Sequence, residues 1–419
     1  MRRFLLGGAV ALAFGSWFLV SAQTTVQPIP PGFDFPADEQ VLLKLLDAND
    51  VPGMRRHAWM VFAGLTSSTT SGEAVWETWN SAEETFQQGA PPPAPPTARR
   101  PQRNFRRPRQ FQGVGGAPPP APGESLASFT LFNTELKDFV QTHQLQKKSA
   151  LKAINDAFTP QTPIADRKIP DFPRSAVALK TVWWIVKKSE LTAMPIFDPD
   201  LNPVIPTGNP PRTWKRCVAV DAQRPTVPPE ETTTLACNGG PGNGTHVVSL
   251  ERFYHFPLTQ AQIDAMGQSA ADIPNLSTAA PGDFAVLIAM HYTTKEIPEW
   301  VWATFWWHDK PDTGSFAADR PVDVKGVWRN YLMSESYGMD TPKQPDGSAH
   351  VAFNPWLEAR FPDGTVSNCM TCHRRAVFAG KPSDGAFLPV TRGTPPANDP
   401  RFKGATAVDF LWSIVFESQ

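Results

Sequence analysis

Five consecutive residues near the end of the chain, Cys369-Met370-Thr371-Cys372-His373, bring two thiols and an imidazole close together. Such donors bind transition metals or undergo covalent and redox chemistry. A zinc site would need further cysteine or histidine ligands at suitable spacing, and the sequence has no second close pair. A redox dithiol would need a thioredoxin-like βαβ context, which the surrounding sequence lacks. A disulfide between Cys369 and Cys372 would leave His373 without a role.

The spacing of this motif matches the attachment of haem c. Two thiols add to the two vinyl groups of haem as thioethers, and the adjacent histidine then lies under the iron as its proximal ligand. We therefore predict one haem c, bound covalently through Cys369 and Cys372, with His373 as the proximal iron ligand.

In these five residues the sequence resembles the c-type cytochromes, and the resemblance covers only the motif and its flanks. It implies that Asn368 begins a helix and that Arg374 and Arg375 pair with the haem propionates. Small electron-transfer cytochromes take their sixth iron ligand from a later methionine, but the 46 residues after His373 contain neither methionine nor histidine. The distal ligand must therefore come from upstream, or the iron has an open face.

Three upstream histidines are candidates for the distal iron ligand. His308 ends the strand-like segment 300–308, His350 lies on a polar loop, and His291 lies near the end of a neighbouring strand-like segment. Met290, a weaker candidate, adjoins His291 but points to the opposite side because side chains alternate along a strand.

The segment 300–308 is also rich in tryptophan. Its period of two places Trp300, Trp302, Trp306 and His308 on one face. Such a face could wall a haem pocket or belong to the core of a sheet, and the sequence leaves both interpretations open.

The N-terminus predicts export. Arg2 and Arg3 precede an uncharged apolar run at 4–20, and small residues near 22 offer a cleavage site. We predict a signal peptide at 1–22 and a periplasmic or secreted bacterial protein, with a retained N-terminal membrane anchor as the alternative. No later run is long enough to span a bilayer, so we expect no transmembrane span in the mature chain. Export agrees with the motif, because bacteria attach haem c outside the cytoplasm.

The rest of the chain of 419 residues predicts three regions and an α+β fold. Residues 23–88 form a small helical head, with helices at 38–47 and 54–65. Residues 89–123, rich in proline and arginine, form a disordered linker. Residues 124–419 form the haem-binding body, with an antiparallel sheet, irregular segments and a C-terminal haem site. The 45 prolines disfavour a long helical bundle.

Periodicity suggests the elements of this body. Residues 124–158 show the spacing of helices, whereas 177–185 and 212–220 read as strands. The best hairpin joins 283–292 to 300–308.

Cys217 and Cys237 are 20 residues apart in an exported chain, so a structural disulfide is the natural interpretation, with thiolate ligation of iron as an alternative.

Three classes of function remain. The first is periplasmic electron transfer with a redox partner protein. The second is a haem enzyme or ligand sensor, with an open iron site for peroxide, a nitrogen oxide or an organic substrate. The third is a structural or binding protein in which haem only fastens the C-terminus. Binding of nucleic acid is not expected, because the formal net charge is −1.

Overall fold

The computed structural model describes most of the chain. The described residues are 26–89, 105–106, 125–199, 201, 209–237, 244–267, 273–344, 346–361, 364–379, 393–394, 399 and 402–419. The signal peptide predicted at 1–22 and nearly all of the linker predicted at 89–123 lie outside them. Within the described residues, helices and largely antiparallel sheets form an α+β fold, as the sequence predicts.

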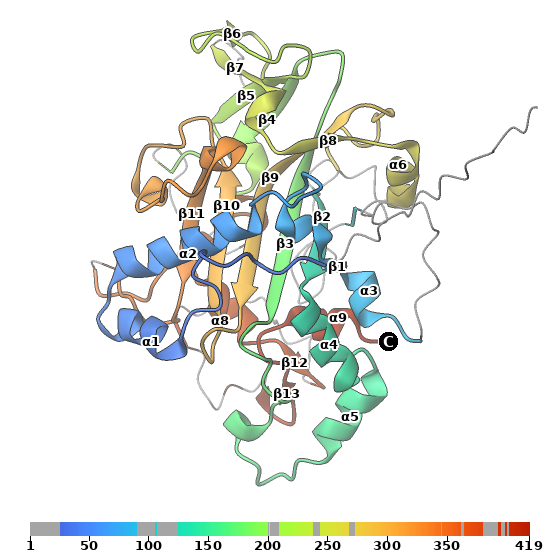
Figure 1. Ribbon diagram of the computed structural model, residues 1–419, viewed down its shortest axis with the longest axis vertical. Helices are drawn as coiled ribbons and strands as arrows, with labels where there is room; N and C mark the ends of the chain where they lie inside the picture. The colour runs from blue at the N-terminus through green and yellow to red at the C-terminus, as the bar shows by residue number, and fades with distance from the viewer. Residues whose placement is uncertain are drawn as a thin grey trace, which may run out of the picture.

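A seven-stranded antiparallel sheet forms the centre of the described structure (Figure 1). Its strands follow the order β1-β2-β3-β9-β10-β11, and β8 pairs with one end of β9. The strands are β1 (Asn80–Ser81), β2 (Ala127–Phe132), β3 (Val177–Val186), β8 (His255–Pro257), β9 (Phe284–Thr294), β10 (Val301–Trp307) and β11 (Tyr331–Ser336). The long strands are apolar along most of their length because both faces of the sheet are covered.

A smaller sheet lies at the upper end of the central sheet in Figure 1. Its order is β4-β5-β7-β6, with β5 and β7 parallel. Its strands are β4 (Thr192–Ile196), β5 (Arg216–Asp221), β6 (Thr232–Thr233) and β7 (Thr245–Ser249). A disulfide between Cys217 and Cys237 ties β5 to the segment after β6, which confirms the predicted pairing.

Helices cover both faces of the central sheet. They are α1 (Glu39–Asp47), α2 (Val51–Leu65), α3 (Ala82–Phe86), α4 (Thr134–Thr142), α5 (Lys148–Asp156), α6 (Gln260–Met266), α7 (Pro355–Glu358), α8 (Cys369–His373) and α9 (Trp412–Glu417). Helix α2 crosses one face, where the ring of Phe62 stacks on Phe305 with centroids 4.0 Å apart (Figure 1). On the other side lie α8 and α9, near a two-stranded sheet of β12 (Val377–Phe378) and β13 (Thr406–Ala407).

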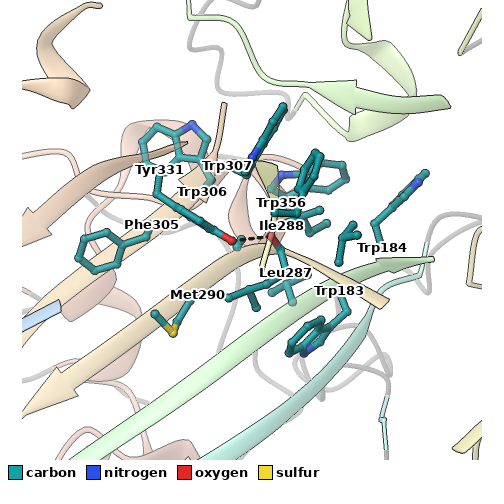
Figure 2. Close-up of a cluster of buried hydrophobic side chains, with 14 of the residues drawn as sticks. Trp183, Trp184, Leu287, Ile288, Met290, Phe305, Trp306, Trp307, Tyr331 and Trp356 are labelled. Atoms are coloured by element: carbon teal, nitrogen blue, oxygen red, sulfur yellow. Dashed lines mark hydrogen bonds between the residues drawn. The ribbon is translucent and has the colours of Figure 1, made fainter. Parts of the chain in front are cut away.

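The upper part of the central sheet is an aromatic core. Figure 2 shows side chains of β3, β9, β10 and β11 gathered there, with Trp356 of α7 beside Trp184 at a centroid distance of 5.6 Å. The hydroxyl of Tyr331 donates a hydrogen bond of 2.7 Å to the carbonyl of Leu287. Polar atoms of aromatic side chains need such partners when they are buried.

Most predicted elements are confirmed. The helices expected at 38–47 and 54–65 are α1 and α2, and the hairpin expected from 283 to 308 is β9 and β10, paired antiparallel. Helix α2 shares the main core with the sheet, since Trp59 packs on Phe305 at 5.2 Å, whereas Leu42 of α1 packs in a smaller cluster with Val301 of β10. No described helix is long and apolar enough to cross a membrane, and α2, the longest of them, has 15 residues.

The prediction of helices throughout 124–158 is wrong for its first part. Ala127–Phe132 forms strand β2, and only α4 and α5 follow as helices. Strand β2 lies between β1 and β3 and is buried on both faces, so its sequence lacks the alternation of a half-buried strand. Leu131 therefore falls at helical spacing from Leu136 although it belongs to a strand.

Candidate haem-binding site

The Cys-x-x-Cys-His motif forms the short helix α8. Positions i, i+3 and i+4 of a helix share one face, so Cys369, Cys372 and His373 project to the same side. Asn368 caps the helix, because its side-chain oxygen accepts a hydrogen bond of 2.9 Å from the amide of Met370. This confirms that a helix begins at Asn368.

The same asparagine ties α8 to the end of β11 and to the loop before the motif. Its side-chain amide donates to the carbonyls of Gly338, at 3.1 Å, and His350, at 3.2 Å. Its oxygen also accepts from the hydroxyl of Ser336 at 2.7 Å. The position of the motif relative to the central sheet is therefore fixed by one buried side chain.

All three motif side chains line a cavity between the central sheet and the segments carrying α7, α8 and α9. The cavity opens to solvent, and the space within it and its mouth is about 1220 Å³. Trp302 of β10 and Trp412 and Phe416 of α9 contribute aromatic walls. The cavity therefore has the largely apolar lining that a macrocycle requires.

His373 is held in the orientation of a metal ligand. Its Nδ1 lies 2.8 Å from the carbonyl oxygen of Phe410. A carbonyl only accepts, so Nδ1 carries the proton and Nε2 has the lone pair. The ring packs against Trp302 with centroids 4.2 Å apart. Burial lowers the pKa of His373 to about 4, so the imidazole is neutral at pH 7, as metal ligation requires.

The two thiols of the motif are free. Cys369 donates a hydrogen bond of 3.4 Å to the carbonyl of Ala352, and neither cysteine takes part in a disulfide. Burial raises the pKa of Cys369 well above its usual range and that of Cys372 to about 11. The structure therefore holds both thiols protonated and facing the same cavity.

Of the three distal candidates, the structure brings only His291 to this cavity. His350 donates from Nε2 to the carbonyl of Glu335 at 2.7 Å and is directed toward β11. His308 follows the far end of β10, six residues beyond Trp302, which is about 20 Å along a strand. Met290 is fully buried in the aromatic core on the opposite face.

His291 lies in the middle of β9, opposite Lys180 of β3 and Thr304 of β10. Among the described residues, its ring has no hydrogen-bond partner. Burial lowers its pKa well below the usual range, and the nearby positive charge of Lys180 adds to this effect. Two neutral imidazoles, one from the sheet and one from α8, thus face the same cavity.

The tryptophans predicted to share a face divide between two environments. Trp302 lines the cavity. Trp306 packs beside Phe316 at 5.0 Å, and Trp300 precedes β10 and packs on Phe172 at 5.6 Å. Trp300 has a positive φ of 66°, so the period of two begins only after it.

Sequence analysis missed the lysine and the two carboxyl groups of the cavity, which belong to Lys180, Glu358 and Glu417. Burial lowers the pKa of Lys180 to about 8, although the carboxylates of Glu358 and Glu417 oppose the shift. Burial raises the pKa of Glu358 to about 7. The sequence does mark Lys180 as unusual, because it is the single charged residue in the otherwise uncharged strand Val177–Val186.

The arrangement fits haem better than a simple metal ion. Within the described parts of the chain, no three or more His, Cys, Asp or Glu side chains converge as a metal site. Two free thiols and a correctly bonded imidazole, all facing one apolar cavity, match the requirements for covalent haem. Comparisons with family models, curated proteins and solved structures find no match to this chain.

Proposed function

We propose that the chain is an exported single-haem c-type cytochrome that takes part in electron transfer outside the cytoplasm. The observation that carries this proposal is the convergence of Cys369, Cys372 and His373 with His291 at one cavity. The cysteines would hold haem c through thioethers, and Nε2 of His373 would ligate the iron. The bound haem would supply a one-electron redox centre.

The surroundings of His373 support a redox role. The carbonyl of Phe410 fixes the tautomer of the imidazole, and the ring of Trp302 restricts its rotation and excludes water from one side. A hydrogen bond to the second ring nitrogen strengthens a histidine as a metal ligand. Such a ligand would move little when the charge of the iron changes, which favours rapid electron exchange.

His291 favours electron transfer over ligand chemistry. It is the distal candidate that lines the cavity, and among the described residues it has no hydrogen bond to lose by ligation. An iron with two imidazole ligands has no open position for a substrate. We therefore assign His291 as the sixth ligand within this proposal.

A second candidate function is a haem enzyme or ligand sensor with an open distal site. Lys180 and Glu358 favour it, because acid–base groups that line a haem cavity can hydrogen-bond to a ligand or supply protons. In that case His291 would act as an acid–base group beside the iron.

Covalent attachment is tested by producing the protein with a cytochrome c maturation system and staining a denaturing gel for haem. We expect a haem-stained band for the wild type and for M370L, a control within the motif. We expect none for the double variant C369A/C372A. A band that persists in the double variant, or is absent from the wild type, would contradict the proposal.

The optical spectrum of the reduced protein, taken before and after carbon monoxide, separates the two functions. With two strong ligands, carbon monoxide leaves the spectrum unchanged, and H291A makes it responsive, while the exposed-site control H143A does not. A wild-type spectrum that shifts readily would instead support the enzyme or sensor.

A further inference from the structure

Glu358 is held rigidly over the cavity. Its carboxylate accepts a hydrogen bond of 2.6 Å from the amide of Asn354, the residue that caps the other end of α7. The side-chain amide of Asn354 donates to the hydroxyl of Thr304 at 2.7 Å and to the carbonyl of Phe305 at 3.1 Å. Helix α7 is thus fastened to β10, so Glu358 keeps a fixed position relative to the sheet.

The charged groups around Glu358 come from every wall of the cavity. Lys180 lies on β3, His291 on β9, Glu417 on α9, and the thiols and imidazole of the motif on α8. Lys180 attracts the carboxylate of Glu358, and Glu417 lies close enough to Lys180 to act on its charge as well. The cavity therefore has one lysine facing two carboxyl groups, and neither imidazole is charged at neutral pH.

Resting on the proposed function, we propose that Glu358 takes up a proton when the haem is reduced, so that the protein moves a proton together with an electron. One electron from a one-electron donor reduces iron(III) to iron(II). One proton from solvent binds the carboxylate of Glu358. No other bond forms or breaks.

Electrostatics in the cavity explains why reduction of the haem would raise the proton affinity of Glu358. The electron adds one negative charge to a half-buried cavity with a largely apolar lining. At an effective dielectric constant of about 20, a charge about 10 Å away changes the proton affinity of a carboxyl group roughly tenfold. Glu358 is already poised for this change, because burial raises its pKa to about 7. A solvent-exposed carboxyl group, with a pKa near 4.3, would stay ionised throughout.

The test is the midpoint potential of the haem, measured by redox titration between pH 5 and 10. We expect the wild-type potential to fall between about pH 7 and 8 and to level off above it, by about 59 mV in total, because a tenfold change in proton affinity corresponds to 59 mV for a one-electron couple. The E358Q variant should lose the part of this fall that begins near pH 7, so that any remaining pH dependence comes from Lys180, whose pKa is about 8. E190Q, which removes an exposed carboxylate from the turn after β3, should behave as the wild type.

A second variant keeps the test decisive if E358Q does not fold. K180M removes the cation that stabilises ionised Glu358, so the fall of the potential should begin at a higher pH than in the wild type. Equal slopes in E358Q and the wild type, a pH-independent wild-type potential, or an unchanged onset in K180M would each overturn the inference. A protein without covalent haem would instead overturn the proposed function.

Discussion

The two faces of the central sheet are built from the same strands but differ in chemistry. On one face, Phe305 stacks on Phe62 of α2 and on Tyr292, and the Tyr292 hydroxyl donates to the carbonyl of Ala58 at 2.7 Å. On the other face, the next residue back along β9 is His291, opposite Lys180. Alternation along one strand therefore separates a packed aromatic face from a face that lines a cavity.

The difference shows where stability and chemistry reside. Aromatic packing supplies a large part of the free energy of folding, because it buries apolar area and leaves few polar groups unpaired. The cavity face does the opposite, since it buries a lysine and an imidazole whose charged forms are costly there. A protein keeps such groups where function requires them, and packing in other regions must offset their unfavourable contribution to the free energy of folding.

The largest expected effect comes from breaking the aromatic face. Phe305→Ala removes a ring that packs on Phe62, Trp59 and Tyr292, and should lower the free energy of unfolding by about 3–5 kcal/mol. Urea denaturation measures this change in the free energy of unfolding. Val322→Ala, at a side chain that is 83% exposed, is the control and should change stability by less than about 0.5 kcal/mol. A loss of under 1 kcal/mol for Phe305→Ala would show that the two faces do not differ as described.

A smaller effect comes from removing the buried charge of the cavity face. Lys180 has a pKa of about 8 in the folded protein and 10.5 when exposed, so the unfolded chain binds its proton more tightly. The free energy of unfolding should therefore rise between about pH 8 and 10.5, by up to about 3 kcal/mol from this group.

Lys180→Met removes this contribution. The difference in unfolding free energy between the variant and the wild type, measured by urea denaturation at several pH values, should then shrink steadily above pH 8. Lys188→Met, at an exposed lysine after β3, should leave the pH dependence unchanged. A difference that is constant with pH would mean that Lys180 keeps its proton and is better solvated than its position suggests.

The smallest effect on stability is expected for His291→Ala. The ring faces the cavity and, among the described residues, makes no hydrogen bond, so haem-free protein should change its unfolding free energy by less than about 1 kcal/mol. Thermal unfolding followed by circular dichroism measures it. A loss of several kcal/mol would place His291 among the packed residues of the fold, which would weaken its assignment as an iron ligand.

Local patterns in the sequence predict much of this fold. The helices α1 and α2 and the strands β3, β9 and β10 follow from periodicity, because each has a long run of regular spacing. Strand β2 does not, since burial on both faces removes the alternation that marks a strand. The pairing of β3 with β9 joins segments about a hundred residues apart, and no local pattern encodes it.

Local sequence patterns also predict only part of the candidate site. The motif predicts Cys369, Cys372 and His373, because their spacing alone sets their chemistry. The choice of His291 over His308 depends on where distant strands and α8 meet, and that is a property of the tertiary structure. Glu358 reaches the cavity only through the anchoring of α7 by Asn354, which spacing does not reveal.

The pairing of β3 with β9 also has a kinetic consequence. The four strands of the smaller sheet lie between these two partners along the chain, and the Cys217–Cys237 disulfide closes a local loop among them. Local contacts of this kind form quickly, whereas closure over a long separation is slow. We therefore expect the smaller sheet to fold early. The central sheet is completed only when β9 pairs with β3. Until then α8 has no cavity wall opposite it, so under the proposed function its thiols would remain accessible for haem attachment.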